Sequence, residues 1–305
     1  MNSNEILILT VSKRSATYSP DAIRLGFNMH TIFTNTSIAT KLGSRIELKL
    51  GRSWLSFLFD NSWKKKLPQI KKLIIVATPQ SVAVVRYINK KFPEISVFVW
   101  YNNPVSMEVP LKYFLNLNCS IYTFDEDDSK KYNLIFSKQY IDLEPIKDVL
   151  NVNQDIKNDV VFIGGDKGRV VELLEVKESF LKRNISLKLY VVSTDNDMEG
   201  FPYQPKVSYK YLLKMQNESR AILEILQDGQ SGISLRTLEA MFMKKKLITN
   251  NKNIEQADFY YKKNIFILGV DDLEGLEEFM NTPFQEVLKE IMDQYTFEGW
   301  VQRFI

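Results

Sequence analysis

The sequence predicts an α/β protein made of two Rossmann-like halves, each with its own parallel sheet. Short apolar runs alternate with amphipathic segments along the chain, which is typical of parallel strands joined by helices. A polar stretch from Asp142 to Asp159 interrupts this alternation and contains no complete predicted element, so we expect it to link the halves. The expected domains are residues 1–145 and 155–285. Apolar side chains at mostly helical spacing predict a C-terminal helix over residues 286–305.

Apolar runs predict five strands in each half. In the first half they lie at residues 6–9, 31–34, 73–77, 96–100 and 120–124. Helices are expected between them, notably at 80–91 and 109–117. In the second half the strands lie at 160–163, 187–192, 221–226, 247–249 and 264–268. Helices separate them at 169–182, 208–216, 233–243 and 273–280.

Composition excludes several classes of protein. A chain of 305 residues with 45% hydrophobic content has enough apolar surface for a globular core. The net charge of +3 is too small to indicate nucleic-acid binding. The single cysteine, Cys119, excludes a disulfide framework, and the single histidine, His30, excludes a histidine-based zinc site. The chain shows no signal peptide and no apolar stretch of about 18 residues, so we expect a cytoplasmic protein.

A glycine turn follows the first strand of the second half. Gly164 and Gly165 end the apolar run, and Lys167 and Arg169 stand where the next helix begins. Glycines allow close backbone approach, and a helix N-terminus beside two cations attracts a diphosphate. The spacing matches neither a dinucleotide fingerprint nor a P-loop, so a purely structural glycine turn is the alternative.

A second polar turn lies between the strand at 221–226 and the helix at 233–243. It carries Gln230, Ser231, Gly232 and Ser234, and the carboxyl end of a parallel strand is where ligands bind in open α/β sheets. In the helix, Glu239 falls on the flank of an apolar face. Its carboxylate needs a partner if it is buried, and Arg236 or a ligand hydroxyl would serve. The alternative is a glutamate that is turned to solvent or paired with a lysine.

The run from Gln230 through Ser234, Arg236 and Glu239 to Asn250 resembles the donor-binding segment of GT-B-fold glycosyltransferases, above all bacterial enzymes of capsule, lipopolysaccharide and exopolysaccharide synthesis. The resemblance implies two Rossmann-like domains facing a cleft, with a C-terminal helix that crosses back to the first domain. It implies that Glu239 binds the ribose of a nucleotide-sugar donor and that the glycine turn faces the donor phosphates. Many retaining members carry a second glutamate eight residues earlier, where this chain has Ser231, so retention or inversion stays open.

The first half offers two candidate catalytic residues, Asp125 and His30. Asp125 follows a predicted strand and opens an acidic run, and His30 precedes another predicted strand. An Asp-x-Asp pair after a strand is also how GT-A-fold glycosyltransferases hold a metal, and Asp125 with Asp127 fits that pattern. We favour the alternative in which Asp125 precedes a helix whose first turn is acidic, and we expect no metal.

The segment Gly51 to Lys72 combines four aromatic residues with six cations. Aromatic rings favour the headgroup region of a bilayer, and cations favour an anionic surface. Such a segment predicts peripheral attachment to the inner face of the cell membrane, where a lipid-linked glycan acceptor would lie. A core-facing aromatic helix followed by solvated lysines is the alternative.

The sequence therefore predicts a metal-independent glycosyltransferase that moves a sugar from a nucleotide-sugar donor to a surface polysaccharide. Two alternatives remain: a non-catalytic glycosyltransferase-like partner subunit, and a sugar-nucleotide epimerase on the same fold.

Overall fold

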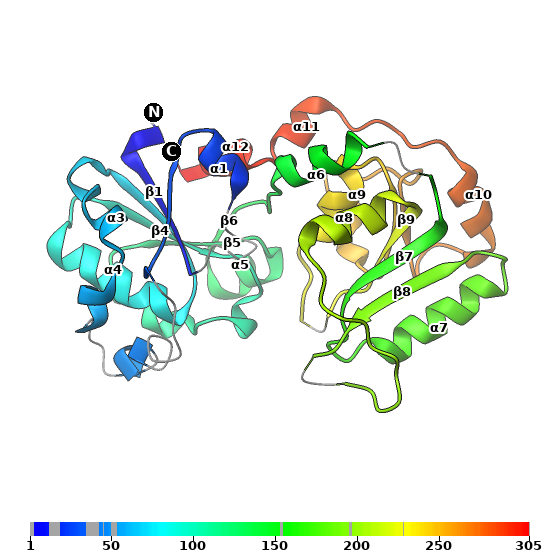
Figure 1. The fold of residues 1–305 in the computed structure, drawn as a ribbon, viewed down its shortest axis with the longest axis horizontal. Helices are drawn as coiled ribbons and strands as arrows, with labels where there is room; N and C mark the ends of the chain where they lie inside the picture. Colours follow the sequence, from blue (N-terminus) through cyan, green and yellow to red (C-terminus); the bar gives the residue numbers. More distant parts are fainter. Residues whose placement is uncertain are drawn as a thin grey trace. The chain divides into compact units, whose positions relative to one another are not determined.

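The computed structural model describes residues 3–11, 19–34, 43–44, 46–49, 54–152, 155–194, 197–227 and 229–304. The chain divides into two compact units (Figure 1). The first comprises residues 1–142 and 297–305, so both termini belong to it, and the second comprises residues 143–296. Each unit contains one parallel sheet, which confirms the predicted pair of α/β halves.

The first unit is built on a six-stranded parallel sheet in the order β2-β1-β3-β4-β5-β6. Its strands are β1 Ile6–Thr10, β2 Asn28–Thr31, β3 Lys72–Val76, β4 Ser96–Tyr101, β5 Ser120–Thr123 and β6 Ile135–Phe136. The strand order reverses direction at β1, because β2 lies on one side of it and β3 to β6 lie on the other.

The two faces of the first sheet bury different layers. On one face, helix α4 (Pro79–Lys91) packs Val82, Val85 and Ile88 into the core, and a capping box from Thr78 to Ser81 starts the helix. The other face carries an aromatic cluster that includes Trp100 of β4 and Trp300 of α12 (Phe297–Val301). Their ring centroids lie 4.8 Å apart. Shorter helices are α1 Pro20–Arg24, α3 Asn61–Lys64 and α5 Glu126–Tyr132.

The second unit is built on a five-stranded parallel sheet in the order β11-β10-β9-β7-β8. Its strands are β7 Asn158–Gly165, β8 Leu187–Val192, β9 Ser219–Glu224, β10 Lys246–Thr249 and β11 Ile265–Ile267. The order reverses at β7, with β8 on one side and β9 to β11 on the other. In open α/β sheets the crevice at such a reversal is the usual ligand site.

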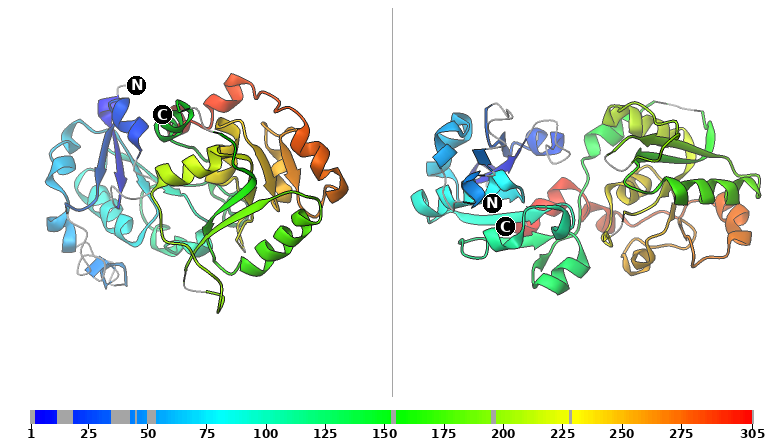
Figure 2. Two further views of the ribbon diagram at one scale, coloured as in Figure 1. Left: turned by 45° about the vertical axis from the view of Figure 1, so that its right-hand side comes forward. Right: turned by 90° about the horizontal axis from the view of Figure 1, so that it is seen from below.

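Alternating side chains of β7 bury helices on both faces of the second sheet. Val160 and Phe162 share a core with α7 (Val170–Leu181) and α10 (Leu276–Asn281), which lie along the same face in Figures 1 and 2. Val161 and Ile163 point the other way and pack on Met215 of α8 (Tyr209–Asn217). Further helices of this unit are α6 Leu143–Leu150, α9 Leu235–Phe242 and α11 Lys289–Asp293.

Several predicted elements differ from the structure. The second strand covers Asn28–Thr31 rather than 31–34, and the helix expected at 109–117 is reduced to a 3-10 turn at Leu111–Tyr113. The polar stretch after Asp142 is not without structure, because Leu143–Leu150 forms α6 with Ile146 and Val149 buried. The tail forms two short helices, α11 and α12, instead of one. No helix in the described residues is long and apolar enough to span a bilayer.

Candidate functional site

The glycine turn lies at the reversal point of the second sheet. Gly164 and Gly165 end β7, and the backbone turns through Lys167 and Gly168, whose φ angles are +51° and +80°, before α7 begins. The Lys167 amide donates to Thr194 Oγ1 at 3.0 Å, which joins the turn to the segment after β8. The turn is thus held on the β8 side of β7.

Asp166 already occupies the N-terminus of α7. Its Oδ1 accepts from the amides of Arg169 and Val170 at 3.0 and 3.2 Å, and its Oδ2 accepts from the Tyr203 hydroxyl. Burial acts to raise the pKa of Asp166, but the hydrogen bonds from Tyr203, Val170 and Arg169 outweigh it and lower that pKa. The expected attraction of a diphosphate by this helix end is therefore already satisfied by the chain's own carboxylate.

Arg169 is a clamp on the backbone. Its Nη1 donates to the carbonyl of Ile225, its Nη2 to that of Gly165, and its Nε to that of Asp166 at 3.1 Å. The side chain is buried, and it joins the end of β7 to the residue that follows β9. Burial and the neighbouring charge of Arg236 lower the pKa of Arg169 to about 10. Because three carbonyls occupy its donors, Arg169 shapes the site rather than reaching into it.

Arg236 lies beside this clamp. Its guanidinium donates through Nη2 to the carbonyl of Ile163. Its Nε and Nη1 make no hydrogen bond to the residues that the structure describes. The guanidinium carbons of Arg236 and Arg169 lie 5.1 and 5.2 Å from the ring centroid of Phe162. Arg236 therefore keeps donors for a ligand.

Gly164 allows both guanidinium groups to approach the end of β7. A Cβ atom at Gly164 would lie 3.0 Å from Nη2 of Arg236 and 3.4 Å from Nη2 of Arg169. A larger residue would push at least Arg236 aside. The glycine is needed here for close approach, since its φ is not in the left-handed region.

The three cations repel one another without a paired carboxylate. None of Lys167, Arg169 and Arg236 forms an ion pair within the described part of the chain. Burial, followed by the charges of Arg169 and Arg236, lowers the pKa of Lys167. Three carboxylates act on the charge of Arg169, namely Asp166, Glu172 and Glu224. Each of them accepts a hydrogen bond from another side chain. Lys167 and Arg236 thus place positive charge at this end of β7 that no carboxylate of the described residues pairs with.

The buried carboxylate of Glu224 fixes the second polar turn. The sequence predicted this residue in the interior of a strand at 221–226. Glu224 is the last residue of β9, and its carboxylate accepts from the hydroxyls of Ser234, Thr237 and Thr249. Ser234 also caps α9, where its Oγ accepts from the Arg236 amide at 3.0 Å. Ser234 and Glu224 therefore hold the helix start, and with it Arg236, in place.

The remaining residues of this turn lie between Glu224 and Ser234. The amide of Gln230 donates to the Gln227 carbonyl at 3.2 Å, and the carbonyl of Ser231 accepts from Asn251 Nδ2 at 3.3 Å. Gly232 is buried. Asp228 lies outside the described residues. The bonds of Gln230 and Ser231 close the turn on itself and on the segment after β10.

Glu239 is buried, with 4% of its surface exposed, and its partners come from α8. Tyr209 donates its hydroxyl to Oε1 at 2.9 Å, and Gln216 donates Nε2 to Oε2 at 2.7 Å. Burial raises the pKa of Glu239, although both hydrogen bonds and Arg236 oppose the shift. The expected partner Arg236 instead bonds Ile163. Sequence reasoning missed Tyr209 and Gln216, whose seven-residue spacing puts them on one side of α8.

The two catalytic candidates of the first unit have local structural roles. Asp125 caps α5, accepting from the Asp128 amide at 3.0 Å, as the acidic first turn of that helix suggested. His30 lies in β2, and its Nδ1 is 2.9 Å from the Ser62 hydroxyl. No group of three His, Cys, Asp or Glu side chains able to hold a metal occurs among the described residues, Asp125 and Asp127 included.

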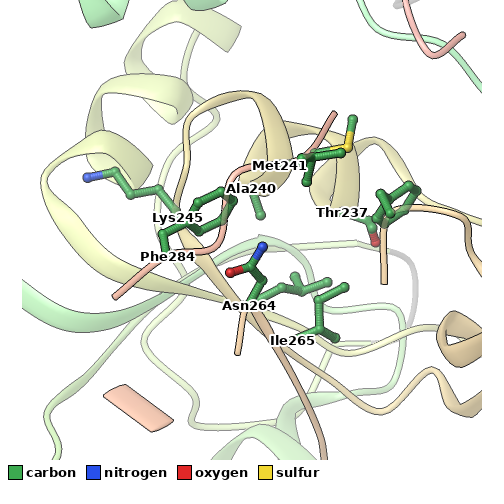
Figure 3. Close-up of a pocket in the computed structure, with 10 residues that line it drawn as sticks. Thr237, Ala240, Met241, Lys245, Asn264, Ile265 and Phe284 are labelled. Carbon is green, nitrogen blue, oxygen red and sulfur yellow. The ribbon is translucent and has the colours of Figure 1, made fainter. Parts of the chain in front are cut away.

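A separate, shallow and largely apolar depression lies against α9 (Figure 3). Its lining includes Ala240, Met241, Ile265 and Phe284. It also includes Thr237, whose hydroxyl donates to Glu224. Asn264 bonds both the amide and the carbonyl of Gln285 at 2.7 Å. The depression therefore lies against Phe284, and its lining includes none of Lys167, Arg169 and Arg236.

No protein-family model matches the chain, and no curated protein matches it in sequence. Among solved structures it is similar to a spinosyn forosaminyltransferase, with a TM-score of 0.42, 7% identity, and 98% of each chain covered. It is also similar to a protein of Listeria monocytogenes described as a UDP-N-acetylglucosamine 2-epimerase, with a TM-score of 0.46, 7% identity, and 98% and 93% of the two chains covered. With TM-scores below 0.5, neither likeness assigns a function, which has to be argued from the chain's own residues.

Proposed function

We propose that the chain is a glycosyltransferase that moves a sugar from a nucleotide-sugar donor to a surface-polysaccharide acceptor. The observation that carries the proposal is the pair Arg236 and Lys167 at the reversal point of the second sheet, beside Gly164. No carboxylate of the described residues pairs with these cations, and a bound diphosphate would supply the opposite charge. The segment that holds Arg236 is also the one that resembles the donor-binding segment of GT-B enzymes.

The proposed roles follow from the contacts. Arg236 and Lys167 neutralise the diphosphate leaving group, and they take the place of a metal ion in stabilising the charge that develops as the glycosidic bond breaks. Arg169 keeps the turn in shape through its three carbonyl bonds. Glu239 binds the ribose. The turn at Gln230, Ser231 and Gly232 lies next to the donor sugar or its phosphates.

Binding and turnover test this proposal in two steps. Thermal shift across UDP, GDP, dTDP and CMP identifies the base, and the matching nucleotide sugars are then incubated with the protein and the products analysed. We expect one nucleotide to raise the melting temperature, and slow donor hydrolysis that persists in EDTA. No shift with any nucleotide would overturn the proposal, and loss of activity in EDTA with rescue by manganese would restore a metal-dependent mechanism.

One observation favours a second candidate, a non-catalytic partner subunit. Asp125 caps a helix and His30 bonds Ser62, so neither presents itself as a general base in its own unit. Nucleotide binding without hydrolysis or transfer would support this candidate. A C2-epimerised sugar nucleotide formed without acceptor would instead indicate an epimerase.

We also propose that the first unit docks on anionic membrane where a lipid-linked acceptor lies. Trp54 and Phe57 are 54% and 72% exposed, whereas Phe59 and Trp63 of the same segment are buried in the core. The proposed membrane contact is therefore made by Trp54 and Phe57, together with Lys64 and Lys65 of the same segment. Residues 51–53 lie outside the described part.

Vesicle sedimentation tests the membrane contact. A Lys64→Ser/Lys65→Ser variant should pellet less with anionic vesicles than the wild type, most clearly at low salt, because screening is strong beyond about 8 Å at physiological salt. Lys90→Ser/Lys91→Ser at the end of α4 is the matched control. If the wild type stays in the supernatant at low salt, the proposed membrane contact is wrong.

A further inference from the structure

The two side chains that hold Glu239 differ in their access to solvent. Gln216 is buried, with 1% of its surface exposed, whereas Tyr209 is 40% exposed although its hydroxyl reaches the buried carboxylate. Tyr209 stands at the start of α8, directly after the capping residue Ser208. A ligand that approaches Glu239 from this side meets the Tyr209 ring first.

One of the groups around Glu239 is an acceptor that has no donor among the described residues. Gln216 uses its Nε2 for Glu239, and its Oε1 is buried with no hydrogen-bond partner. Turning the amide over would not help while Glu239 is ionised, because two acceptors would then face each other. A buried acceptor left without a donor destabilises the folded chain, so the site gains from a ligand with hydroxyl donors.

We propose that Tyr209 is a displaceable gate whose phenol hydroxyl takes the place of a ligand hydroxyl on Glu239. When the nucleotide binds, a ribose hydroxyl donates to Glu239 Oε1, and a second hydroxyl of the same diol can supply the donor that Gln216 Oε1 lacks. The Tyr209 ring then leaves toward solvent, which its exposed position permits. The identity of the ligand as a nucleotide rests on the function proposed above.

The gate lowers the affinity for the nucleotide, because each binding event has to break the hydrogen bond between Tyr209 and Glu239. Removing the phenol hydroxyl removes the competitor and leaves the carboxylate ready for the ligand. Only ligands that reach Glu239 feel this effect. Inorganic pyrophosphate, which lacks ribose and engages Lys167 and Arg236, should not.

Calorimetry on the full chain tests the gate with Tyr209→Phe and the matched control Tyr211→Phe, another exposed tyrosine of α8. The probes are inorganic pyrophosphate and the tightest binder among UDP, GDP, dTDP and CMP. We expect Tyr209→Phe to bind the nucleotide roughly three- to tenfold more tightly, on the scale of one lost hydrogen bond, with pyrophosphate unchanged. In a Glu239→Gln background the gain should shrink, since the competing bond is then neutral.

The outcomes separate the gate from the function. Nucleotide affinity that is unchanged or weaker in Tyr209→Phe overturns the gate and leaves the proposed function standing. Equal tightening of nucleotide and pyrophosphate also overturns it, because the effect would not depend on ribose. A wild type that binds neither probe overturns the proposed function and the gate with it. Melting temperatures of the variants show whether a loss comes from misfolding.

Discussion

The two units share one topology, and in the second unit the described residues place cations at its reversal point. Both sheets reverse direction beside their first strand, β1 in the first unit and β7 in the second. In the second unit Arg169 and Arg236 converge on the end of that strand. In the first unit, the residue described directly after β1 is the apolar Val11. After β3, Thr78 forms the capping box that starts α4. The parallel sheet supplies an open edge, and the side chains at that edge set its charge.

Each unit also brings like charges close together. In the first, Asp142 lies against Asp21, and its Oδ1 accepts from the Ser19 hydroxyl and from the Asp21 amide. In the second, the crowded groups at the sheet edge are cations. Buried like charges cost stability, which an oppositely charged ligand can restore. Each of the following substitutions changes a charged residue in one of the two units.

The largest effect is expected from Arg169→Met. Loss of the guanidinium leaves the carbonyls of Gly165, Asp166 and Ile225 without these donors, at about 1 to 3 kcal/mol for each buried group. We expect a melting temperature lower by roughly 10 °C and a loss of nucleotide binding, measured by circular dichroism and calorimetry.

Arg183→Met is the matched control for Arg169→Met. Arg183 also donates to backbone carbonyls, those of Ser179 and Leu273, but it follows the far end of α7. It should lower stability while nucleotide affinity stays. A stable Arg169→Met variant with unchanged binding would show that the clamp is not needed.

The alternation of apolar and amphipathic segments was enough to predict most strands of both sheets, because strands such as β7, β9, β10 and β11 are largely buried apolar runs. The second strand was expected three residues too late. Two short elements escaped. β6 has two exposed residues, and α6 begins in a polar stretch with only Ile146 and Val149 buried. Elements stabilised by so few buried side chains leave little periodicity to detect.

The sequence predicted which residues belong to the candidate site but not their contacts. Lys167, Arg169 and Arg236 were all candidates, and the fold brings them together. Arg169 donates to the carbonyl of Ile225, and Glu239 accepts from Tyr209 and Gln216 of α8. Such partners are distant in sequence, so local spacing could not reveal them.

Glu239→Gln separates function from stability in the second unit. The burial that raises the pKa of Glu239 favours its protonated form in the folded state, so stability falls as pH rises above the unfolded value of 4.5. A neutral glutamine can still accept from Tyr209, and its amide can donate to Gln216 Oε1 once that side chain turns over. We expect an equal or higher melting temperature at pH 8.

In the same variant nucleotide binding should weaken by tens of fold, since a charge-assisted bond contributes about 1.5 to 3 kcal/mol. Thermal unfolding at pH 5 and pH 8, together with nucleotide calorimetry, measures both effects. Lower stability at pH 8 with full nucleotide affinity would make Glu239 a purely structural residue.

The smallest effect is expected in the first unit, from Asp142→Asn. Burial, with a contribution from Asp21, raises the pKa of Asp142 from 3.8 to about 7, so its charge costs stability as pH rises through that window. The variant should melt a few degrees higher than the wild type at pH 8, and the difference should be smaller at pH 5. Asp148→Asn, at an exposed position, is the control. A pH-independent difference would mean that Asp142 carries its charge at little cost.

The most direct test of the anion site is a calorimetric titration of inorganic pyrophosphate into the full chain, at low and at physiological salt. The wild type is compared with Arg236→Gln and with Lys188→Gln, which removes one exposed charge from β8. We expect binding by the wild type and Lys188→Gln to be equal, and binding by Arg236→Gln to be weaker by about tenfold or more, since a charged hydrogen bond contributes about 1.5 to 3 kcal/mol. Equal affinity of Arg236→Gln and the wild type, or no binding by any of the three, would contradict an anion site at the reversal point of the second sheet.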